Sequence, residues 1–446
     1  MLSFMLVIST LKKNTGLANE PLDLEGLVKK AAKKSIPALI NEHKLKKAEF
    51  SQRNDFYAFF PTLDFETGRG LDYSLDEEAD KFVFDSSNSM SLSLSIPIFA
   101  NGSRFYQLKD GKLALEQVKI DVLDSMSQFI VDLIELYFNF HLTTAQLEIT
   151  DFKRENVKTS LEKAKELVTL GIKTEIDVFD REIELAQIER SILNLNNSKK
   201  NILSKIKNYI NSKKKISFKS IELGSYKPYY LSKFEKNIET IRSKGKRRLL
   251  ENNLSIKSGK ISLERSKLAY REESKKRWPK ANLAASVNRD YGRFVNQLDE
   301  GVEKRPIDSA SLSASLTWDL WDNYSIERTI GIAASNHEID LLNFEKESRQ
   351  VIQDYNEHLQ NFTLLEQSIE ISKLASEKAE NQYNFAKEMY DLGKIPVSTL
   401  AGAIETRFRS QLQLIELKSE KLVLMATIPK TLGYSLLPSK GHRKAN

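Results

Sequence analysis

Long stretches without proline constrain the fold of this chain more than any other feature. Residues 101–170 contain no proline, and apolar side chains recur along them in steps of three and four residues, as at Val118, Val122 and Met126. This spacing places the apolar side chains on one stripe of an α-helix. At about 1.5 Å per residue, such a helix would extend roughly 105 Å. The core of a globular domain does not accommodate a rod of this length, whereas a coiled coil or a helical bundle does.

A second such stretch, at residues 323–392, belongs to an internal repeat. When Phe99 is aligned with Trp321, the two lie 222 positions apart, and Gly171 and Gly393 are separated by the same number of positions. Further upstream, a Phe-Pro pair and a Trp-Pro pair are 218 positions apart. Matches in one order and in nearly one register predict a duplicated unit.

Each half also contains segments in which apolar and small polar side chains alternate. Met90, Leu92 and Leu94, for example, alternate with serines, which is the period of a β-strand with one apolar face. We expect strands at residues 57–67 and 88–99 in the first half and at 278–288 and 309–321 in the second, separated by long polar loops at 68–87 and 289–308.

The duplicated unit is therefore predicted to be a β-hairpin joined to a long helical hairpin, in a chain that is mainly α. We predict a first repeat over residues 19–210, with a helix at 22–53 and a helical hairpin at 101–210 that turns at residue 171, and a second repeat over residues 234–437, with a helix at 234–275 and a helical hairpin at 323–428 that turns at residue 393.

Three segments lie outside the repeats. Residues 1–18 are interpreted as the remnant of a signal peptide, because an apolar start precedes small residues at the positions that a signal peptidase reads. Residues 211–233 are a loop-like linker between the halves, and residues 438–446 are a basic tail.

The two repeated glycines mark where each helical hairpin reverses. Gly171 and Gly393 interrupt a helical pattern, and glycine tolerates the left-handed backbone conformation that ends a helix. Thr174 and Ser398 follow them and can cap the returning helix. We expect these turns to be the functional tips of the hairpins.

The four predicted strands are too few to close a β-barrel within one chain. An open four-stranded sheet leaves two unpaired edges, and a bilayer offers no water to satisfy their backbone groups. Strands of about ten residues with one apolar and one polar face are typical of outer-membrane barrels. Aromatic side chains at the strand ends, such as Phe60, Trp278 and Trp321, match the girdles at a membrane interface. The sequence thus predicts a barrel built from several copies, with a soluble β-sandwich as the alternative.

Composition excludes several classes of site. The chain has no cysteine, so a disulfide, a catalytic thiol and a cysteine-bound zinc ion are impossible. Its five histidines are scattered, and no phosphate-binding glycine loop or serine nucleophile elbow is present. We therefore predict no enzyme activity, no catalytic residue, no cofactor and no metal.

Two other functions are compatible with long helices and a net charge of +7. One is a soluble coiled-coil scaffold in which the strands form a small sheet. The other is a basic helical protein that binds nucleic acid, which requires basic residues gathered on one face. Neither explains alternating strands at matched spacing, so nucleic acid is not an expected partner.

The order of the motifs resembles that of a known family. A strand, a Pro-x-Phe motif at residues 97–99, an Asn-Gly pair at 101–102, a long helix and a Leu-Gly-x-x-Thr-x-x-Asp-Val motif at 170–178 are similar to the TolC-type outer-membrane efflux proteins, or outer membrane factors. The resemblance covers about residues 21–437. It implies a homotrimer with a twelve-stranded barrel in the lipid of the outer membrane and an α-helical tunnel in the periplasm.

The same resemblance implies a function and partners. Members of the family are passive conduits that serve drug-efflux pumps or type I secretion. They receive their substrates from a periplasmic adaptor protein and an inner-membrane transporter, and they close at the periplasmic tips. Here the apolar residues Ile172, Ile395 and Val397 lie next to the tip glycines and are expected to contact the adaptor.

A gate is also implied by the resemblance. In the family an aspartate after the first tip glycine bonds a tyrosine before the second, and Asp177 and Tyr390 occupy these places. The alternative is that Asp177 only stabilises the start of its helix and that Tyr390 only packs. The position of the family's locking arginine holds Ile395, and the positions of its aspartate ring hold Thr399 and Gly402. The resemblance therefore supports a latch between Asp177 and Tyr390 but gives no support for an acidic ring.

Overall fold

The computed structural model describes residues 21–76, 81–172, 174–212, 216–231, 234, 245–293 and 307–438. The predicted signal peptide, parts of the linker and the basic tail from residue 439 lie outside these residues. The chain divides into two compact units, and each is described by itself. The helical unit contains residues 1–44, 120–257 and 346–446, and the sheet unit contains residues 45–119 and 258–345.

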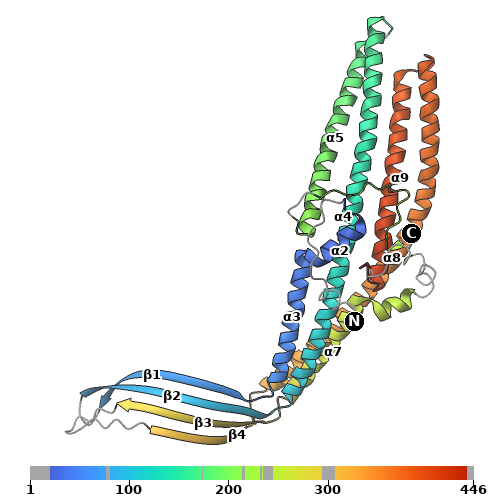
Figure 1. Cartoon of the computed structure of the whole chain (residues 1–446). Coiled ribbons are helices and arrows are strands. Elements are labelled where there is room, and N and C mark those ends of the chain that lie inside the picture. Colours follow the sequence, from blue (N-terminus) through green and yellow to red (C-terminus); the bar gives the residue numbers. More distant parts are fainter. Residues whose placement is uncertain are drawn as a thin grey trace, which may run out of the picture. The chain divides into compact units, whose positions relative to one another are not determined.

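Long helices dominate the described chain (Figure 1). They are α2 (Leu24–Lys34), α3 (Ile36–Tyr57), α4 (Ser103–Thr169), α5 (Glu175–Tyr209), α7 (Leu254–Lys275), α8 (Ser325–Asp391) and α9 (Val397–Thr431). α4 and α8 each contain 67 residues, and α5 and α9 each contain 35. The prediction of a mainly α chain with a small β part is confirmed.

The backbone turns of the two halves match one another. Among the described residues, eight have a left-handed backbone, with φ between 48° and 75°. An insertion or deletion in one half alone would change the separation between matching turns of the two halves. They form four pairs, each 222 positions apart: Asn101 with Asn323, Gly102 with Tyr324, Gly171 with Gly393, and Asn211 with Gly433.

A cap at Ser35 divides the helix that the sequence predicts at residues 22–53. α2 ends at Lys34, and Ser35 has an extended backbone with ψ of 149°. The Oγ of Ser35 accepts a hydrogen bond from the Ala38 N–H at 3.1 Å and so caps α3. Pro37 therefore lies in the first turn of a helix, where its missing N–H is not needed, rather than at a kink.

Two other predicted helix boundaries are wrong. Asn253 interrupts the helix predicted at residues 234–275, because its Oδ1 accepts the Ile256 N–H at 3.0 Å and starts α7 there. The second hairpin does not end at residue 428, since α9 continues through Pro429 to Thr431. A proline this close to the end of a helix removes only one hydrogen bond.

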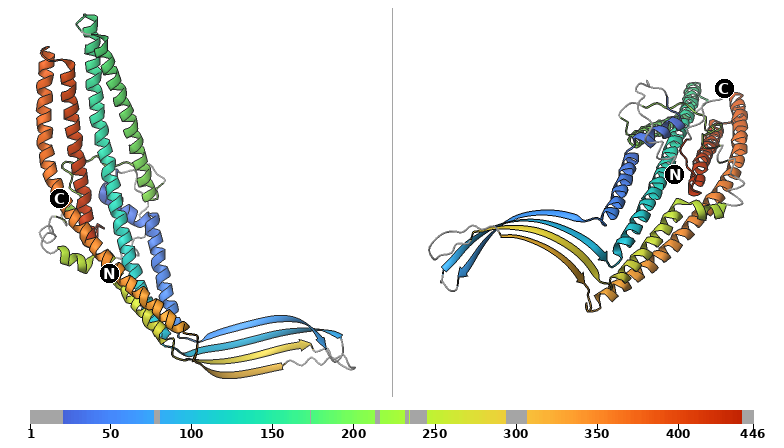
Figure 2. Two further views of the ribbon diagram at one scale, coloured as in Figure 1. Left: turned by 180° about the vertical axis from the view of Figure 1, so that it is seen from behind. Right: turned by 60° about the horizontal axis from the view of Figure 1, so that its bottom comes forward.

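One antiparallel sheet contains the four strands β1 (Thr62–Asp76), β2 (Lys81–Ala100), β3 (Lys280–Arg293) and β4 (Ile307–Thr317), in the order β1-β2-β3-β4 (Figure 2). Leu63, Leu94, Ala285 and Leu312 lie opposite one another in register. Because side chains alternate along a strand, the apolar residues of all four strands share one face. Serines of β2, β3 and β4 share the other face.

Away from the helices the strands extend beyond the predicted boundaries, so the long polar loop predicted at residues 68–87 is wrong, whereas β4 ends at Thr317 rather than at residue 321. β1 starts at Thr62 rather than at residue 57, because α3 reaches Tyr57, and it continues to Asp76. β2 starts at Lys81. Paired backbone groups stabilise the antiparallel ladder whether its side chains are polar or not. Likewise, β3 continues to Arg293 and β4 starts at Ile307, so the loop predicted at residues 289–308 is wrong at both ends, and residues 294–306 lie outside the described residues.

The core of the helical unit is a cluster of buried side chains from α2, α4, α5 and α9. Leu24 and Leu27 of α2, Tyr137 and Phe138 of α4, and Ile206 of α5 are fully buried in it. α2 therefore packs on both α4 and α5. Tyr230 of the linker is buried in the same cluster, and its hydroxyl donates a hydrogen bond to the Leu422 carbonyl of α9 at 2.8 Å.

His141 makes this core sensitive to acid. It is 6% exposed, and its ring lies 4.6 Å from that of Tyr137. Burial, helped by the charge of Lys199, lowers the pKa of His141 from 6.5 to about 4. At a pH between about 4 and 6.5, the unfolded chain binds more protons than the folded chain, because His141 is protonated mainly in the unfolded chain. Stability is therefore fully present above pH 6.5 and falls by about 3 kcal/mol as the pH drops to about 4.

We expect His141→Phe to reduce this loss, because phenylalanine fits the aromatic surroundings and carries no titrating group. The thermal unfolding midpoint, measured by fluorescence between pH 7 and pH 4, should fall less in the variant than in the wild type. His43→Gln, at an exposed histidine, is the control. Equal acid sensitivity of His141→Phe and the wild type would contradict this account.

Candidate functional site

Both helical hairpins reverse through the same backbone turn. Gly171 has φ of 71° and Gly393 has φ of 72°, in the left-handed region. The Ile172 N–H donates to the Leu167 carbonyl, and the Lys394 N–H donates to the Met389 carbonyl, both at 2.9 Å. This is the Schellman ending of a helix, and it satisfies carbonyls that the helix itself leaves unpaired.

The two returning helices begin differently. Before α5, the backbone N–H and the hydroxyl of Thr174 lie 3.4 Å and 3.3 Å from the Asp177 carboxylate, to which both donate. Before α9, the capping position is occupied by Pro396, and no side chain caps the helix. The prediction that Ser398 caps α9 is therefore wrong, because proline at residue 396 places Ser398 within the first turn.

The predicted gate pair lies in one region of the helical unit but is not joined within the chain. Tyr390 Oη is buried and has no hydrogen-bond partner among the described residues. Burial raises the pKa of Tyr390, an effect that the charges of Lys163 and Arg181 oppose and those of Asp391 and Asp177 add to. Asp177 is thus close enough to act on the phenol electrostatically, while its carboxylate accepts hydrogen bonds from Thr174.

Ion pairs that the sequence did not predict connect the two hairpins. Lys163 of α4 lies 3.1 Å from Asp391 at the end of α8. Further along, Lys153 of α4 pairs with Glu405 of α9 and lies 3.8 Å from Glu184 of α5. No single-sequence pattern could have paired these charges, because they are brought together by the packing of one hairpin against the other.

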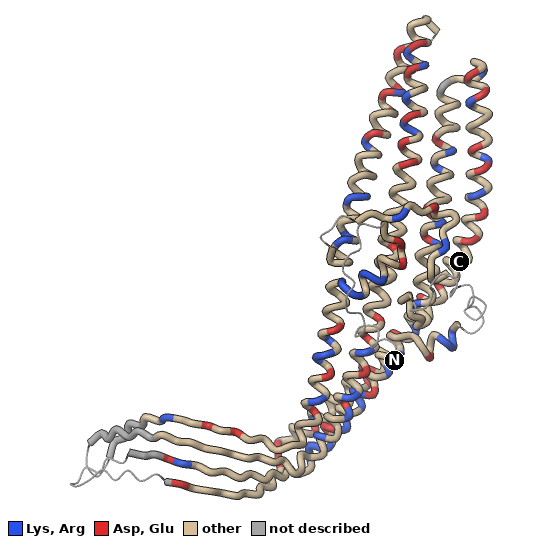
Figure 3. Tube along the Cα trace, in the orientation of Figure 1, with Lys and Arg blue, Asp and Glu red and all other residues tan. Residues whose placement is uncertain are grey.

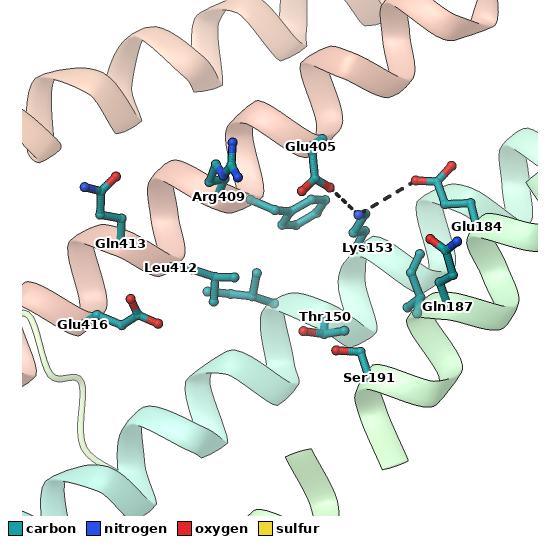
Figure 4. A pocket seen from close by; sticks show the side chains of 13 residues that line it. Thr150, Lys153, Glu184, Gln187, Ser191, Glu405, Arg409, Leu412, Gln413 and Glu416 are labelled. Atoms are coloured by element: carbon teal, nitrogen blue, oxygen red, sulfur yellow. Dashed lines mark hydrogen bonds and ion pairs between the residues drawn. The ribbon is translucent and has the colours of Figure 1, made fainter. Parts of the chain in front are cut away.

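A groove runs beside the second of these contacts (Figure 4). It has a volume of about 650 Å³ and is lined by α4, α5 and α9. Ile188, Phe408 and Leu412 give it an apolar part, and Lys153 and Glu405 lie at its polar part. Its mixed lining fits another protein surface better than a small apolar ligand.

The apolar residues expected at the adaptor contact have different surroundings. Ile172 is 67% exposed, whereas Ile395 is half-buried and packs against the cluster that contains Tyr383 and Leu400. The side chain of Val397 lies outside the described ones. Sequence reasoning missed further exposed apolar residues at the tips, although a leucine precedes the tip glycine in both repeats. These residues are Leu170, Ile176, Phe179 and Leu392.

The described residues hold no acidic ring or metal cluster at the tips. The positions of the family's aspartate ring, Thr399 and Gly402, are exposed and uncharged. Among the described residues, no group of three or more His, Asp or Glu side chains could hold a metal ion. None of the described helices is long and apolar enough to cross a membrane.

Similarity to known proteins extends over nearly the whole chain at the level of fold. The crystal structure of VceC from Vibrio cholerae is 13% identical, with a TM-score of 0.72 over 92% of this chain and 96% of that one. The CmeC outer membrane channel of Campylobacter jejuni is 14% identical, with a TM-score of 0.76 over 95% of this chain and 90% of that one. The open MtrE channel of Neisseria gonorrhoeae is 13% identical, with a TM-score of 0.72 over 92% and 89%.

Sequence similarity to a family is concentrated in the second half. No curated protein sequence matches the chain. Residues 247–433 match the family model described as outer membrane efflux protein. The resemblance to the TolC-type outer-membrane efflux proteins is therefore confirmed, because residues 247–433 carry the sequence pattern of that family and the chain has the fold of its outer-membrane channels.

Proposed function

We propose that this chain is one subunit of a homotrimeric outer-membrane channel, the exit conduit of a tripartite efflux pump or of a type I secretion system. The observation that carries the proposal is the apolar face of the sheet. Phe65, Leu312 and Leu316 on this face are between 66% and 76% exposed. An apolar face of this size is not stable in water, so it requires lipid or protein against it.

The edges of the sheet support assembly from several copies. β1 and β4 each pair with a neighbour on one side only, among the described strands. In a bilayer, β4 of one copy has to pair with β1 of the next, because unpaired backbone groups in hydrocarbon are too costly. Three copies give the twelve strands that the family resemblance implies.

Exposed apolar stripes on the helices fit the same assembly. Exposed apolar residues lie on a seven-residue spacing along α8 and directly after it, with Lys378 at the remaining position: Leu364, Ile371, Phe385 and Leu392. Such a stripe packs against another helix. Neighbouring copies that close the sheet would supply that helix and surround a tunnel.

Transport through this tunnel is passive in our proposal. Substrates enter at the hairpin tips, leave through the barrel, and are driven by a periplasmic adaptor and an inner-membrane transporter. The exposed tip residues Leu170, Ile172 and Leu392 offer the adaptor an apolar surface to bury. The soluble scaffold that the sequence left open would keep the apolar face of the sheet in water.

Two substitutions on neighbouring residues of β2 test the barrel. Leu92 lies on the apolar face and Ser93 on the polar face. Leu92→Arg should abolish the heat-modifiable trimer in the outer-membrane fraction, since an outward arginine near the bilayer midplane costs about 2–4 kcal/mol. Ser93→Arg should leave the trimer intact. A wild-type chain that is recovered in the soluble fraction without detergent would exclude the channel.

The gate pair is tested by single-channel recording in planar bilayers. A hydrogen bond from Tyr390 to the charged Asp177 in the closed trimer would contribute about 1.5–3 kcal/mol, so its loss should raise the open population about tenfold or more. Asp177→Ala with Tyr390→Ala should therefore increase the mean conductance, and Tyr390→Phe should reproduce most of the effect. Unchanged conductance in both variants would exclude this latch.

The ion pair between Lys163 and Asp391 makes a smaller contribution. Both side chains are about half exposed, and pairs of this kind contribute about 0.2–1 kcal/mol. Lys163→Glu, which places two acids together, should increase channel opening by a factor of about five or less. The exchanged pair Lys163→Asp with Asp391→Lys should restore closure. Failure of the exchange to restore it would show that Lys163 acts through another contact.

A further inference from the structure

The two faces of the sheet differ in the net charge of their described side chains. The strands carry few charges compared with the helices (Figure 3). Among strand residues whose side chains the structure describes, the register places three acids and one lysine on the serine-rich face: Asp64, Glu66, Asp290 and Lys280. Both described arginines, Arg69 and Arg289, lie on the apolar face.

The arginines follow the apolar rows that contain Leu92 and Leu94, on the side away from the helices, and Leu71 lies beyond Arg69 on the same face. Arg289 of β3 lies opposite Asp308 of β4, in the same row as Thr67 and Met90. It donates two hydrogen bonds to Asp308, at 2.6 Å and 2.8 Å. Arg69 is in the next row, is exposed, and has no ion-pair or hydrogen-bond partner among the described residues. This end of the apolar face therefore carries a net positive charge in its described side chains.

A shallow trough occupies the two apolar rows next to the arginines. It has a volume of about 390 Å³. Ala285 and Ala310 leave room among larger side chains such as Leu92, Leu94 and Leu312. The trough is thus an apolar slot with cationic side chains beyond one end.

We propose that this surface binds a phosphorylated lipid of the outer leaflet, with an acyl chain in the trough and a phosphate at Arg69 and Arg289. The inference rests on the proposed channel, because the barrel makes this face the lipid-facing one. The helices continue from the opposite ends of the strands, which places the arginines towards the cell exterior if the tunnel lies in the periplasm.

The two parts of the surface select for a lipid phosphate rather than a free one. Adjacent rows are about 7 Å apart and two strands are about 10 Å apart, so both guanidinium groups can reach one headgroup. Guanidinium forks bind phosphate oxygens by charge-assisted hydrogen bonds. The acyl slot adds apolar burial that inorganic phosphate cannot use. The three acids on the other face would repel the same headgroup.

The test is native mass spectrometry of the full-length trimer in detergent, with bis-phosphorylated lipid A, dephosphorylated lipid A and inorganic phosphate as probes. The wild type should retain the phosphorylated lipid in preference to both others. Arg69→Gln should weaken its retention about fivefold, the factor expected for one cation at an anionic lipid surface. Arg69→Lys should preserve most of it. Asp308→Asn, which removes the acid beside Arg289, should strengthen it.

Lys280→Gln is the matched control, because it removes one positive charge from the other face of the same sheet. An equal loss in Lys280→Gln and Arg69→Gln would overturn the assignment. So would equal retention of the phosphorylated and dephosphorylated lipids, or displacement of the lipid by inorganic phosphate. A wild-type trimer that conducts in planar bilayers without this preference refutes the lipid surface alone. A wild type that neither inserts nor conducts refutes the proposed channel and the inference with it.

Discussion

Unpaired backbone groups at the two edges of the sheet are the constraint on which the rest of the structure depends. Each unsatisfied N–H or C=O costs several kcal/mol in hydrocarbon, so an 11-residue edge strand such as β4 cannot remain open there. In the proposed assembly, pairing β4 of one copy with β1 of the next satisfies both edges, and repetition of this contact closes a ring. Every strand continues into a helix, so the ring also determines which helices of neighbouring copies face one another. The apolar stripe on α8 then has a partner.

The repeat explains a strained residue at the start of α8. Tyr324 has φ of 59° at the position that corresponds to Gly102, which has φ of 75°. A left-handed backbone costs a residue other than glycine roughly 1–2 kcal/mol. The ring of Tyr324 packs edge-on against Trp321 at 5.2 Å, a contact that glycine cannot make. Aromatic pairs of this geometry contribute about 0.5–1.5 kcal/mol, which offsets much of the strain. The second half thus keeps the turn while adding an aromatic side chain at the end of the sheet.

Periodicity was enough to predict the helices and the faces of the strands, because both depend on burial that repeats along the sequence. It failed where a single local interaction decides the outcome. Ser35 and Asn253 each interrupt a helical pattern by capping a new helix, and either residue also occurs inside helices. The strand was missed beyond Gly68 because Gly68 and Gly70 indicate a loop, although Leu71, Tyr73 and Leu75 resume the alternation and pair with β2.

The candidate site was predictable only in part, for a related reason. Gly171 and Gly393 could be found because a left-handed turn demands a particular residue. Lys163 and Asp391 are 228 positions apart, and nothing local to either residue indicates that they meet. The resemblance located Asp177 and Tyr390, but the single chain leaves the phenol of Tyr390 without a hydrogen bond among the described residues.

The ion pair between Lys163 and Asp391 is weak, and weak contacts suit a gate. A partly exposed ion pair contributes about 0.2–1 kcal/mol, and a shift from mostly closed to mostly open requires about 5.5 kcal/mol of differential binding. In the proposed trimer, burial of the exposed Leu170, Ile172 and Leu392 by an adaptor would contribute about 25 cal/mol per Å² in each copy. A few hundred Å² of apolar contact that forms only in the open state is therefore enough to open the tips. If the tips were held by buried, fully satisfied networks, a partner of this kind could not open them.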